Sequence, residues 1–332
     1  MSRRSFLVSA GSGLLLSRTI TLCQTPIERG RFDSESVPLA REKLLQLVND
    51  ERAFAGLSPV EMDDLACKVA SDHALDMANR AFLSHWGSDG LKPYHRYSFA
   101  GGIDAVQENV SQANHIASVT PYGVQSDLND MHLKMVNEAP PNDGHRRTIL
   151  APQHTHVGFG VALHEHNVSL VEMFVARYVK VDSIRPSPKR DSTIFISGRL
   201  INPKHFLHQV EVFYEPLPEL LDITWLRTPR AYSLPDLSIA LRPKAPQGTL
   251  YTDGSKGDYD WTADGKFRVP VLPFESKPGI YTVMFWLRKT PADKAFPAAG
   301  ICLRSITGLT FALQSIVTVM PGCFSKSFAS SI

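Results

Sequence analysis

Cysteine is scarce in this chain, and the few cysteines are far apart. The 332 residues include four of them, Cys23, Cys67, Cys302 and Cys323. Their wide spacing matches neither a disulfide framework nor a C-x-x-C metal knuckle. Cys67 lies in an apolar helical stripe, which predicts a buried, unreactive thiol. A disulfide between Cys302 and Cys323 stays open as an alternative, since an oxidising compartment would allow it.

An excess of one charge and long hydrophobic runs are also missing. The formal net charge is +2, and residues 1–24 hold three arginines and no acidic residue. Without them, 32 of the 35 basic residues would stand against 33 acidic ones, a net charge of −1. Such a chain is not expected to bind nucleic acid, because phosphate binding requires a cationic face. The apolar stretches at residues 6–16 and 309–320 are shorter than the ~20 residues that cross a bilayer, so no transmembrane span is expected.

The first residues are typical of a bacterial export signal. Residues 2–7, with Arg3 and Arg4 at their centre, resemble a twin-arginine motif, and the uncharged stretch from Phe6 to Leu16 fits the apolar core of a signal peptide. An ordinary secretory signal with two chance arginines is the alternative. Both interpretations predict that residues 1–24 direct export, so we expect a periplasmic or secreted protein.

Two blocks with different sequence patterns follow the signal. A chain of 332 residues favours two domains. Residues 38–182 mix helical periods with short strands, whereas residues 192–320 form short β-type runs broken by proline and glycine. Residues 183–191 are polar, hold two prolines and are predicted to be a linker. The predicted fold class is α+β, with an all-β immunoglobulin-like sandwich as the second domain.

Apolar periodicity predicts the main elements of the first block. Helices are expected over residues 38–55, 63–80 and 124–138, and a β-hairpin over residues 157–163 and 169–175. These elements place the candidate site residues on a helical and sheet framework.

Two side chains on these helices invite a specific interpretation. His73 falls on the apolar face of the second helix and is predicted to be a hydrogen-bonded packing histidine. Glu138 would end the apolar stripe of the third helix, which directs its carboxylate inward. An unpaired buried charge costs several kcal/mol, so Glu138 needs a partner, and His145 follows seven residues later.

Two histidines and two glutamates occur in recognisable phrases. These are Ser84-His85-Trp86, Glu108-Asn109-Val110, Met135-Val136-Asn137-Glu138 and Gly144-His145-Arg146-Arg147, with Gly56-Leu57-Ser58-Pro59 before them and Val157-Gly158-Phe159-Gly160 after them. In this order, residues 38–182 resemble the CAP superfamily (cysteine-rich secretory proteins, antigen 5, pathogenesis-related 1). The phrase from Gly144 to Leu150 is similar to its bacterial SCP-like branch.

The resemblance implies a fold and a site. The fold would be an α-β-α sandwich, with a largely antiparallel sheet between helical layers. The site would be an open cleft in which His85, Glu108, Glu138 and His145 meet.

Imidazole nitrogen and carboxylate oxygen are normal ligands of zinc, so a divalent metal is the expected cofactor. His85 and His145 are the expected direct ligands. Glu108 and Glu138 would ligate, orient the imidazoles or hold a water. In such a site the carboxylates of Glu108 and Glu138 would lie within a few Å and repel each other. One of them is therefore expected to keep its proton at pH values above its usual pKa of ~4.3 until a metal binds. The alternative is a pair of His–Glu hydrogen bonds that brace the cleft without metal.

Three hypotheses about function remain open. The first is an exported, non-enzymatic module that binds an extracellular or envelope ligand. The second is a metal-assisted hydrolase of peptide or cell-wall material, with a water activated between the histidines and Glu108 or Glu138 as general base. The third is a lipid or sterol carrier, which would need an apolar groove apart from the four residues.

Export can be tested with residues 1–30 fused to a reporter. The fusion should be transported, and changing Arg3 and Arg4 together to lysine should block transport, because the twin-arginine route reads this pair. Reporter activity outside the cytoplasm is the measurement. Unchanged transport of the lysine variant would assign the signal to the general secretory route instead.

Overall fold

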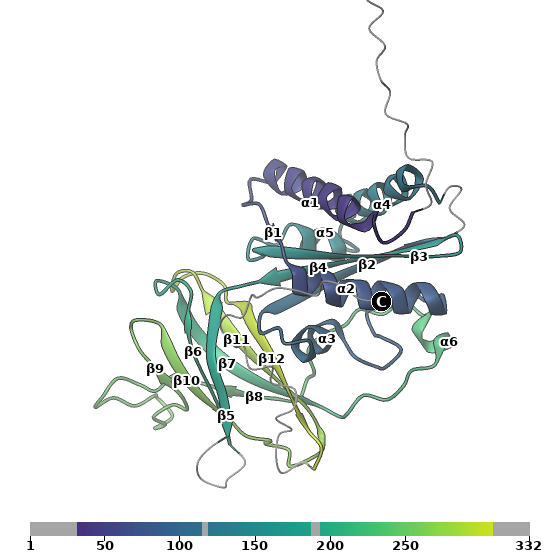
Figure 1. Cartoon of the computed structure of the whole chain (residues 1–332). Coiled ribbons are helices and arrows are strands. Elements are labelled where there is room, and N and C mark those ends of the chain that lie inside the picture. The colour runs from purple at the N-terminus through teal and green to yellow at the C-terminus, as the bar shows by residue number, and fades with distance from the viewer. Residues whose placement is uncertain (1–31, 115–118, 187–192, 308–332) are drawn as a thin grey trace, which may run out of the picture.

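The computed structural model describes residues 32–114, 119–186 and 193–307. Figure 1 shows two parts: a stack of helices and one sheet and, beside it, a part that consists mainly of strands. The predicted export signal, Cys323 and the apolar stretch 309–320 lie outside the described residues. In the part of the chain that is described, no helix is long and apolar enough to cross a bilayer.

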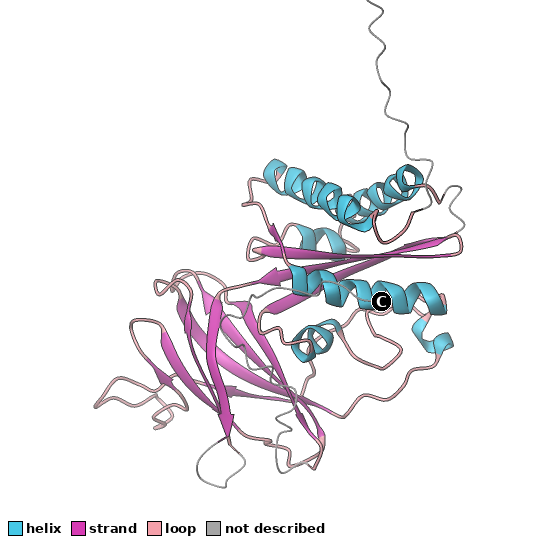
Figure 2. Ribbon diagram, viewed as in Figure 1, coloured by secondary structure: helices cyan, strands magenta, loops and turns pink. Residues whose placement is uncertain are grey.

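The first part is a four-stranded sheet between two helical layers. The sheet has the order β1-β3-β4-β2 and is antiparallel except for the short β1–β3 pair. Helices α1 and α4 cover one face, and α2 and α3 cover the other (Figures 1 and 2). The elements are α1 (Val37–Phe54), β1 (Glu61–Met62), α2 (Asp64–Arg80), α3 (Pro93–Phe99), β2 (Ala105–Ala113), α4 (Pro121–Val136), α5 (Gly144–Ile149), β3 (His156–His164) and β4 (Asn167–Ala176).

Helix boundaries follow local chemistry. Asp63 caps α2 by accepting a hydrogen bond from the Ala66 N–H at 2.6 Å, as the sequence predicts. The predicted end of the third helix is wrong, because α4 ends at Val136 and Glu138 follows it. Pro140 and Pro141 come next and cannot continue a helix, so the chain turns there and Glu138 is not part of the apolar stripe.

Two glycines allow α2 to lie directly on β3. A Cβ atom at Gly158 would lie 2.2 Å from the Cys67 backbone nitrogen, and one at Gly160 would lie 2.1 Å from the Ala70 carbonyl carbon. Only glycine permits this approach of helix and strand backbones. The Cys67 thiol is buried beneath this contact, which confirms its predicted place, and burial raises its pKa.

The second part consists of two four-stranded antiparallel sheets that share one core. Their strand orders are β5-β6-β10-β9 and β12-β11-β7-β8. Ile196 and Val269 from one sheet and Val212 and Phe285 from the other belong to the same apolar cluster. The elements are β5 (Val179–Pro186), β6 (Ile194–Leu200), β7 (Phe206–Glu215), α6 (Ile223–Leu226), β8 (Ser238–Leu241), β9 (Asp260–Trp261), β10 (Lys266–Val271), β11 (Gly279–Arg288) and β12 (Phe296–Ser305).

The boundary between the two parts differs from the predicted linker. Residues 183–186 continue β5, where they pair with β6. Backbone hydrogen bonds to a neighbouring strand thus order a polar, proline-ended segment that lacks an apolar pattern of its own. The other predicted linker residues, 187–191, lie outside the described residues.

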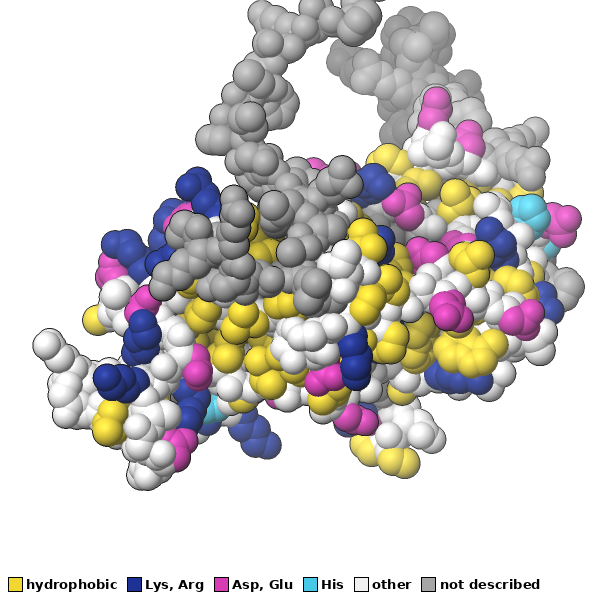
Figure 3. Space-filling model, turned by 90° about the horizontal axis from the view of Figure 1, so that it is seen from below, with side chains coloured by type: hydrophobic (Ala, Val, Ile, Leu, Met, Phe, Trp, Pro, Cys, Tyr) yellow, Lys and Arg dark blue, Asp and Glu magenta, His cyan; other side chains and the backbone are white. Residues whose placement is uncertain are grey.

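The two parts touch through backbone as well as side chains. Asp104, just before β2, forms an antiparallel bridge with Ala299 of β12, and the Gly300 N–H donates to the Ile103 carbonyl at 2.9 Å. Nearby, the Cys302 N–H donates to Ser98 Oγ of α3 at 2.8 Å. On the face shown in Figure 3, hydrophobic side chains gather in the middle, and both signs of charge are mixed around them.

A charged cluster joins β7 to α3. Glu215, the last residue of β7, lies 2.8 Å from Lys92 Nζ and 2.9 Å from His95 Nε2, and Tyr94 Oη donates to it at 3.0 Å. Burial by itself would raise the pKa of Glu215. Its interactions with His95 and then Lys92 outweigh burial and lower the pKa to about 2. Glu215 is therefore an ionised link between the two parts.

Replacing Glu215 with glutamine should lower the free energy of unfolding by roughly 1–3 kcal/mol at neutral pH, because Lys92 and Tyr94 lose a charged partner. The folded pKa lies below the ordinary value of 4.5, so the contribution is complete above about pH 4.5 and is lost as pH falls toward 2. Denaturant unfolding near pH 7, 5 and 3 measures the difference.

The matched control is Glu42→Gln, at an exposed position of α1, which should change stability by about 0.5 kcal/mol or less. A native–variant difference that stays constant down to about pH 3 would contradict an ionised Glu215.

Candidate functional site

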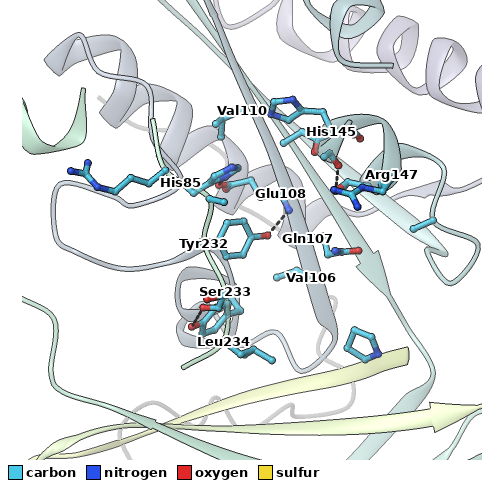
Figure 4. A pocket seen from close by; sticks show the side chains of 18 of the residues that line it. His85, Val106, Gln107, Glu108, Val110, His145, Arg147, Tyr232, Ser233 and Leu234 are labelled. Carbon is cyan, nitrogen blue, oxygen red and sulfur yellow. Dashed lines mark hydrogen bonds and ion pairs between the residues drawn. The ribbon is translucent and has the colours of Figure 1, made fainter. Parts of the chain in front are cut away.

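A cavity of about 950 Å³ lies where the two parts of the chain meet. Its walls come from residues 105–110 of β2, from α5, from residues 229–234 between β7 and β8, and from Met284 and Pro297 of the second part. The four residues that the sequence singled out, His85, Glu108, Glu138 and His145, all line it. Figure 4 shows His85 and His145 at the same end of this cavity, with Ser233 and Leu234 toward the other end.

His85 is held by a buried carboxylate. Its Nδ1 lies 3.0 Å from Glu108 Oε1, and the other oxygen, Oε2, accepts a hydrogen bond from Arg96 Nη2 at 2.6 Å. Arg96 comes from α3, and its Nη1 also donates to the His85 and Leu91 carbonyl oxygens at 2.9 and 2.7 Å. One guanidinium thus fixes both the carboxylate and the backbone that carries the histidine.

The charge state of Glu108 follows from this environment. Burial by itself would raise its pKa, but the charge of Arg96, then of His73, and the hydrogen bond from His85 outweigh burial and lower the pKa to about 2. The expectation that repulsion between carboxylates raises a pKa is therefore wrong for Glu108. An ionised carboxylate only accepts hydrogen bonds, so Nδ1 of His85 carries the proton.

His145 forms a second, more open His–Glu pair. Its Nδ1 lies 2.5 Å from Glu138 Oε1, and its backbone N–H donates to Glu138 Oε2 at 3.0 Å. Glu138 reaches His145 across the turn that follows α4, while His145 stands in the first turn of α5. The pairing expected for Glu138 is present, although it arises from this turn and not from a helix face.

Both histidines keep one ring nitrogen available. Nε2 of His85 and Nε2 of His145 have no hydrogen-bond partner among the described residues, and the two side chains are 15% and 33% exposed. Within the described ranges, no group of three or more His, Cys, Asp or Glu is placed to hold a metal ion. Glu108 and Glu138 contact Nδ1 of the imidazoles, which leaves Nε2 of His85 and of His145, two residues that line the cavity, as the candidate metal ligands.

A buried polar network supports the second pair, and the sequence analysis missed it. The Asn109 amide donates to the His145 carbonyl at 3.3 Å and to Glu172 Oε2 at 3.2 Å. Glu172 Oε1 lies 2.7 Å from His132 Nδ1, in α4, and neither side chain is exposed. Burial alone would lower the pKa of His132, but the charge of Glu172 outweighs it and raises the pKa. The adjacent Glu108-Asn109 pair was the available signal, since neighbours on a strand face opposite sides.

His73 has the structural role that its place on the helix predicts. Its Nε2 lies 2.8 Å from the Ser84 carbonyl oxygen, and it is 1% exposed. Burial, followed by the charge of Arg96, lowers its pKa to about 4. A neutral His73 therefore packs behind the site and positions the residue before His85.

The comparison with known proteins identifies the first part of the chain. Residues 45–178 match the model of the cysteine-rich secretory protein family, CAP. These residues form a CAP domain. The family prediction made from the sequence is thereby confirmed.

Similar proteins are bacterial. The uncharacterized protein YkwD of Bacillus subtilis (strain 168) is 28% identical over 126 residues, which are 38% of this chain and 43% of YkwD. An outer surface protein of Borrelia burgdorferi is 16% identical, with a TM-score of 0.34, over 45% of this chain and 98% of that one. An extracellular protein containing an SCP domain from Bacillus anthracis is 19% identical, with a TM-score of 0.33, over 45% of each chain. The chain thus spans less than half the length of YkwD.

Proposed function

We propose that this protein is an exported bacterial CAP-domain module that binds an extracellular or envelope ligand through a divalent metal, zinc above all, at His85 and His145. The observation that supports it is the pair of His–Glu contacts on one cavity, each made through Nδ1. The proposed function is binding and involves no catalysis.

The chemistry of the two pairs suits metal binding. A carboxylate on Nδ1 sets the tautomer of an imidazole, so that Nε2 presents its lone pair, and it raises the basicity of that nitrogen. Two neutral imidazoles are good zinc ligands, and zinc takes four ligands. His85 and His145 would supply two of them, and the bound ligand or water the others.

The number of protein ligands also makes a metal-assisted hydrolase the weaker alternative. Catalytic zinc sites hold their metal with three protein ligands, and hydrolysis also needs a free general base. Glu108 is bound by Arg96 and His85, and Glu138 is bound twice by His145. Neither carboxylate is free to take a proton from water in this arrangement.

Export and the role of the second part belong to the same proposal. Residues 1–24 carry the signal-like pattern. The strand orders β5-β6-β10-β9 and β12-β11-β7-β8 follow the A-B-E-D and G-F-C-C′ orders of immunoglobulin-like domains, which supports an assignment of the second part, from Val179 of β5 to Ser305 of β12, to that class. Such domains act as adhesion modules in many surface proteins, although fold alone does not assign a function.

Zinc binding tests the proposal directly. Titration calorimetry of the exported form near neutral pH should show one zinc ion bound, with affinity falling as pH approaches about 5, because a free imidazole titrates near ~6.5 and must be neutral to ligate. His85→Ala and His145→Ala should each abolish binding. Glu138→Gln should weaken it by roughly 10–100-fold, as expected for a residue that orients a ligand.

The control is His164→Ala, an exposed histidine at the end of β3, which should bind zinc as the native protein does. Native zinc affinity in both site-histidine variants, with circular dichroism unchanged, would leave the His–Glu pairs as structural braces.

A lipid or sterol carrier is the second candidate, because the end of the cavity away from the histidines has apolar walls. Val106 and Leu234 line this end (Figure 4), and Met284, another lining residue, belongs to the same apolar cluster as Leu234. If an apolar ligand binds there, Leu234→Glu should weaken the binding of a fluorescent sterol at least tenfold and leave zinc affinity unchanged, since a charged group would enter an apolar wall. Sterol titration of the native protein without a saturable signal would remove this candidate.

A further inference from the structure

The connection between β7 and β8, residues 216–237, leaves the second part and crosses the CAP domain before it returns. We call it the crossover segment. The Leu221 N–H donates to the Ser88 carbonyl at 3.0 Å, and Arg227 Nε donates to the Ala81 carbonyl at 2.9 Å. These bonds fix the segment to the loop that carries His85.

An aromatic anchor reinforces this attachment. Trp225 of α6 meets Trp86, the neighbour of His85, edge to face with ring centroids 5.4 Å apart. The Arg230 guanidinium lies 4.0 Å from the Trp225 ring centroid and donates to the Trp225 carbonyl oxygen at 2.6 Å. Further along, the Ser233 carbonyl oxygen accepts a hydrogen bond from Lys92 Nζ at 3.5 Å and lies 3.4 Å from Tyr94 Oη, whose single O–H it shares with Glu215. Both ends of the stretch 225–233 are therefore held on the CAP domain.

Between these attachments stands Tyr232, which reaches the site (Figure 4). Its hydroxyl oxygen accepts the backbone N–H of Glu108 at 2.9 Å. Its ring lies against His85, with centroids 4.7 Å apart and planes inclined by 56°. The His85 imidazole is thus held by a carboxylate at its Nδ1 and by an aromatic ring beside it.

We propose that Tyr232, supplied by the second part of the chain, is a positioning residue for His85, so that the metal site is a two-domain site. The zinc titration that tests this inference rests on the proposed function. A ring with two partners has fewer accessible orientations, so its Nε2 points to one place before any ligand arrives. Tyr232 also satisfies the Glu108 N–H on β2, which is an edge strand of its sheet, and so steadies the backbone of the carboxylate partner.

The second histidine provides an internal comparison. His145 is 33% exposed, and among the described residues no aromatic ring contacts it. Loss of Tyr232 should therefore disturb His85 and leave His145 as it was. A purely structural role in joining the two parts would not single out one imidazole.

The test uses the full chain with Tyr232→Leu, which removes the ring and the hydroxyl but fills most of the volume, and Tyr232→Phe, which keeps the ring. Long-range ¹H–¹⁵N spectra of the zinc-free protein at about pH 8 report the tautomer of each histidine. Native His85 should show Nδ1 protonated. Tyr232→Leu should give a mixture of tautomers at His85 alone, and Tyr232→Phe should restore most of the native signal.

Zinc titration gives the second readout. Tyr232→Leu should weaken zinc binding by roughly 10–100-fold, as for other residues that orient a ligand, and Tyr232→Phe by less. Tyr122→Phe, at a tyrosine that is 75% exposed, is the matched control and should behave as native protein.

The outcomes separate this inference from the proposed function. A native His85 tautomer in Tyr232→Leu overturns the positioning role, as does an equal disturbance of His85 and His145. If Tyr232→Leu does not fold, Tyr232→Phe decides, because it loses the hydrogen bond to the Glu108 N–H: an unshifted Glu108 amide resonance overturns the role, and a shifted one supports it. A native protein that binds no zinc but whose His85 still responds to Tyr232 contradicts the metal function and supports the positioning role.

Discussion

The ion pair between Arg96 and Glu108 is the interaction on which the rest of the site depends. The Glu108 side chain is completely buried, and a carboxylate in that position is stable only with a charged partner. Arg96 supplies the charge and also binds the His85 carbonyl, so the same guanidinium sets the carboxylate and the loop beside it. Once both are fixed, the bond to Glu108 and the Tyr232 ring beside the imidazole together set the orientation of His85.

The two His–Glu pairs differ in how firmly they are held. The His85 pair is enclosed by Arg96 and Tyr232, and its side chains are 15% and 0% exposed. The side chains of the His145 pair are 33% and 24% exposed. The pair stands on the short α5 and on a turn, and Asn109 ties the His145 backbone to β2. An incoming ligand would therefore meet one fixed imidazole and one that can adjust.

Periodicity in the sequence was sufficient for the regular parts of the CAP domain. The helices α1 and α2 and the β3–β4 hairpin were predicted because each carries a clear apolar pattern and a local signal such as the Asp63 cap. Strand β2 was not predicted, since its core is the polar run Gln107-Glu108-Asn109, in which the Glu108 and Asn109 side chains are buried by partners from other segments. The end of α4 was placed too late because the spacing of its apolar stripe was extended to Glu138, whereas the helix ends at Val136, before the turn at Pro140 and Pro141.

The contacts that complete the site could not be predicted from any local sequence pattern. Tyr232 is 124 residues from Glu108, in a stretch with no strand or helix period, and Glu172 is a polar residue within the apolar run of β4. Such pairs are selected by where the folded backbone brings two segments together. The sequence could show that His85 and Glu108 carry chemistry, but not which residues hold them.

The need for a metal follows a different logic from the ability to bind one. Structural zinc sites are assembled from ligands that repel one another or have no partner until the ion arrives, so the metal supplies folding energy. Here each carboxylate already has its donors, and Arg96 offsets the charge that the ion would otherwise balance. The cleft is organised by its own hydrogen bonds, so a divalent ion would add to a finished site. If zinc binds as proposed, its removal should therefore change the stability of the fold little.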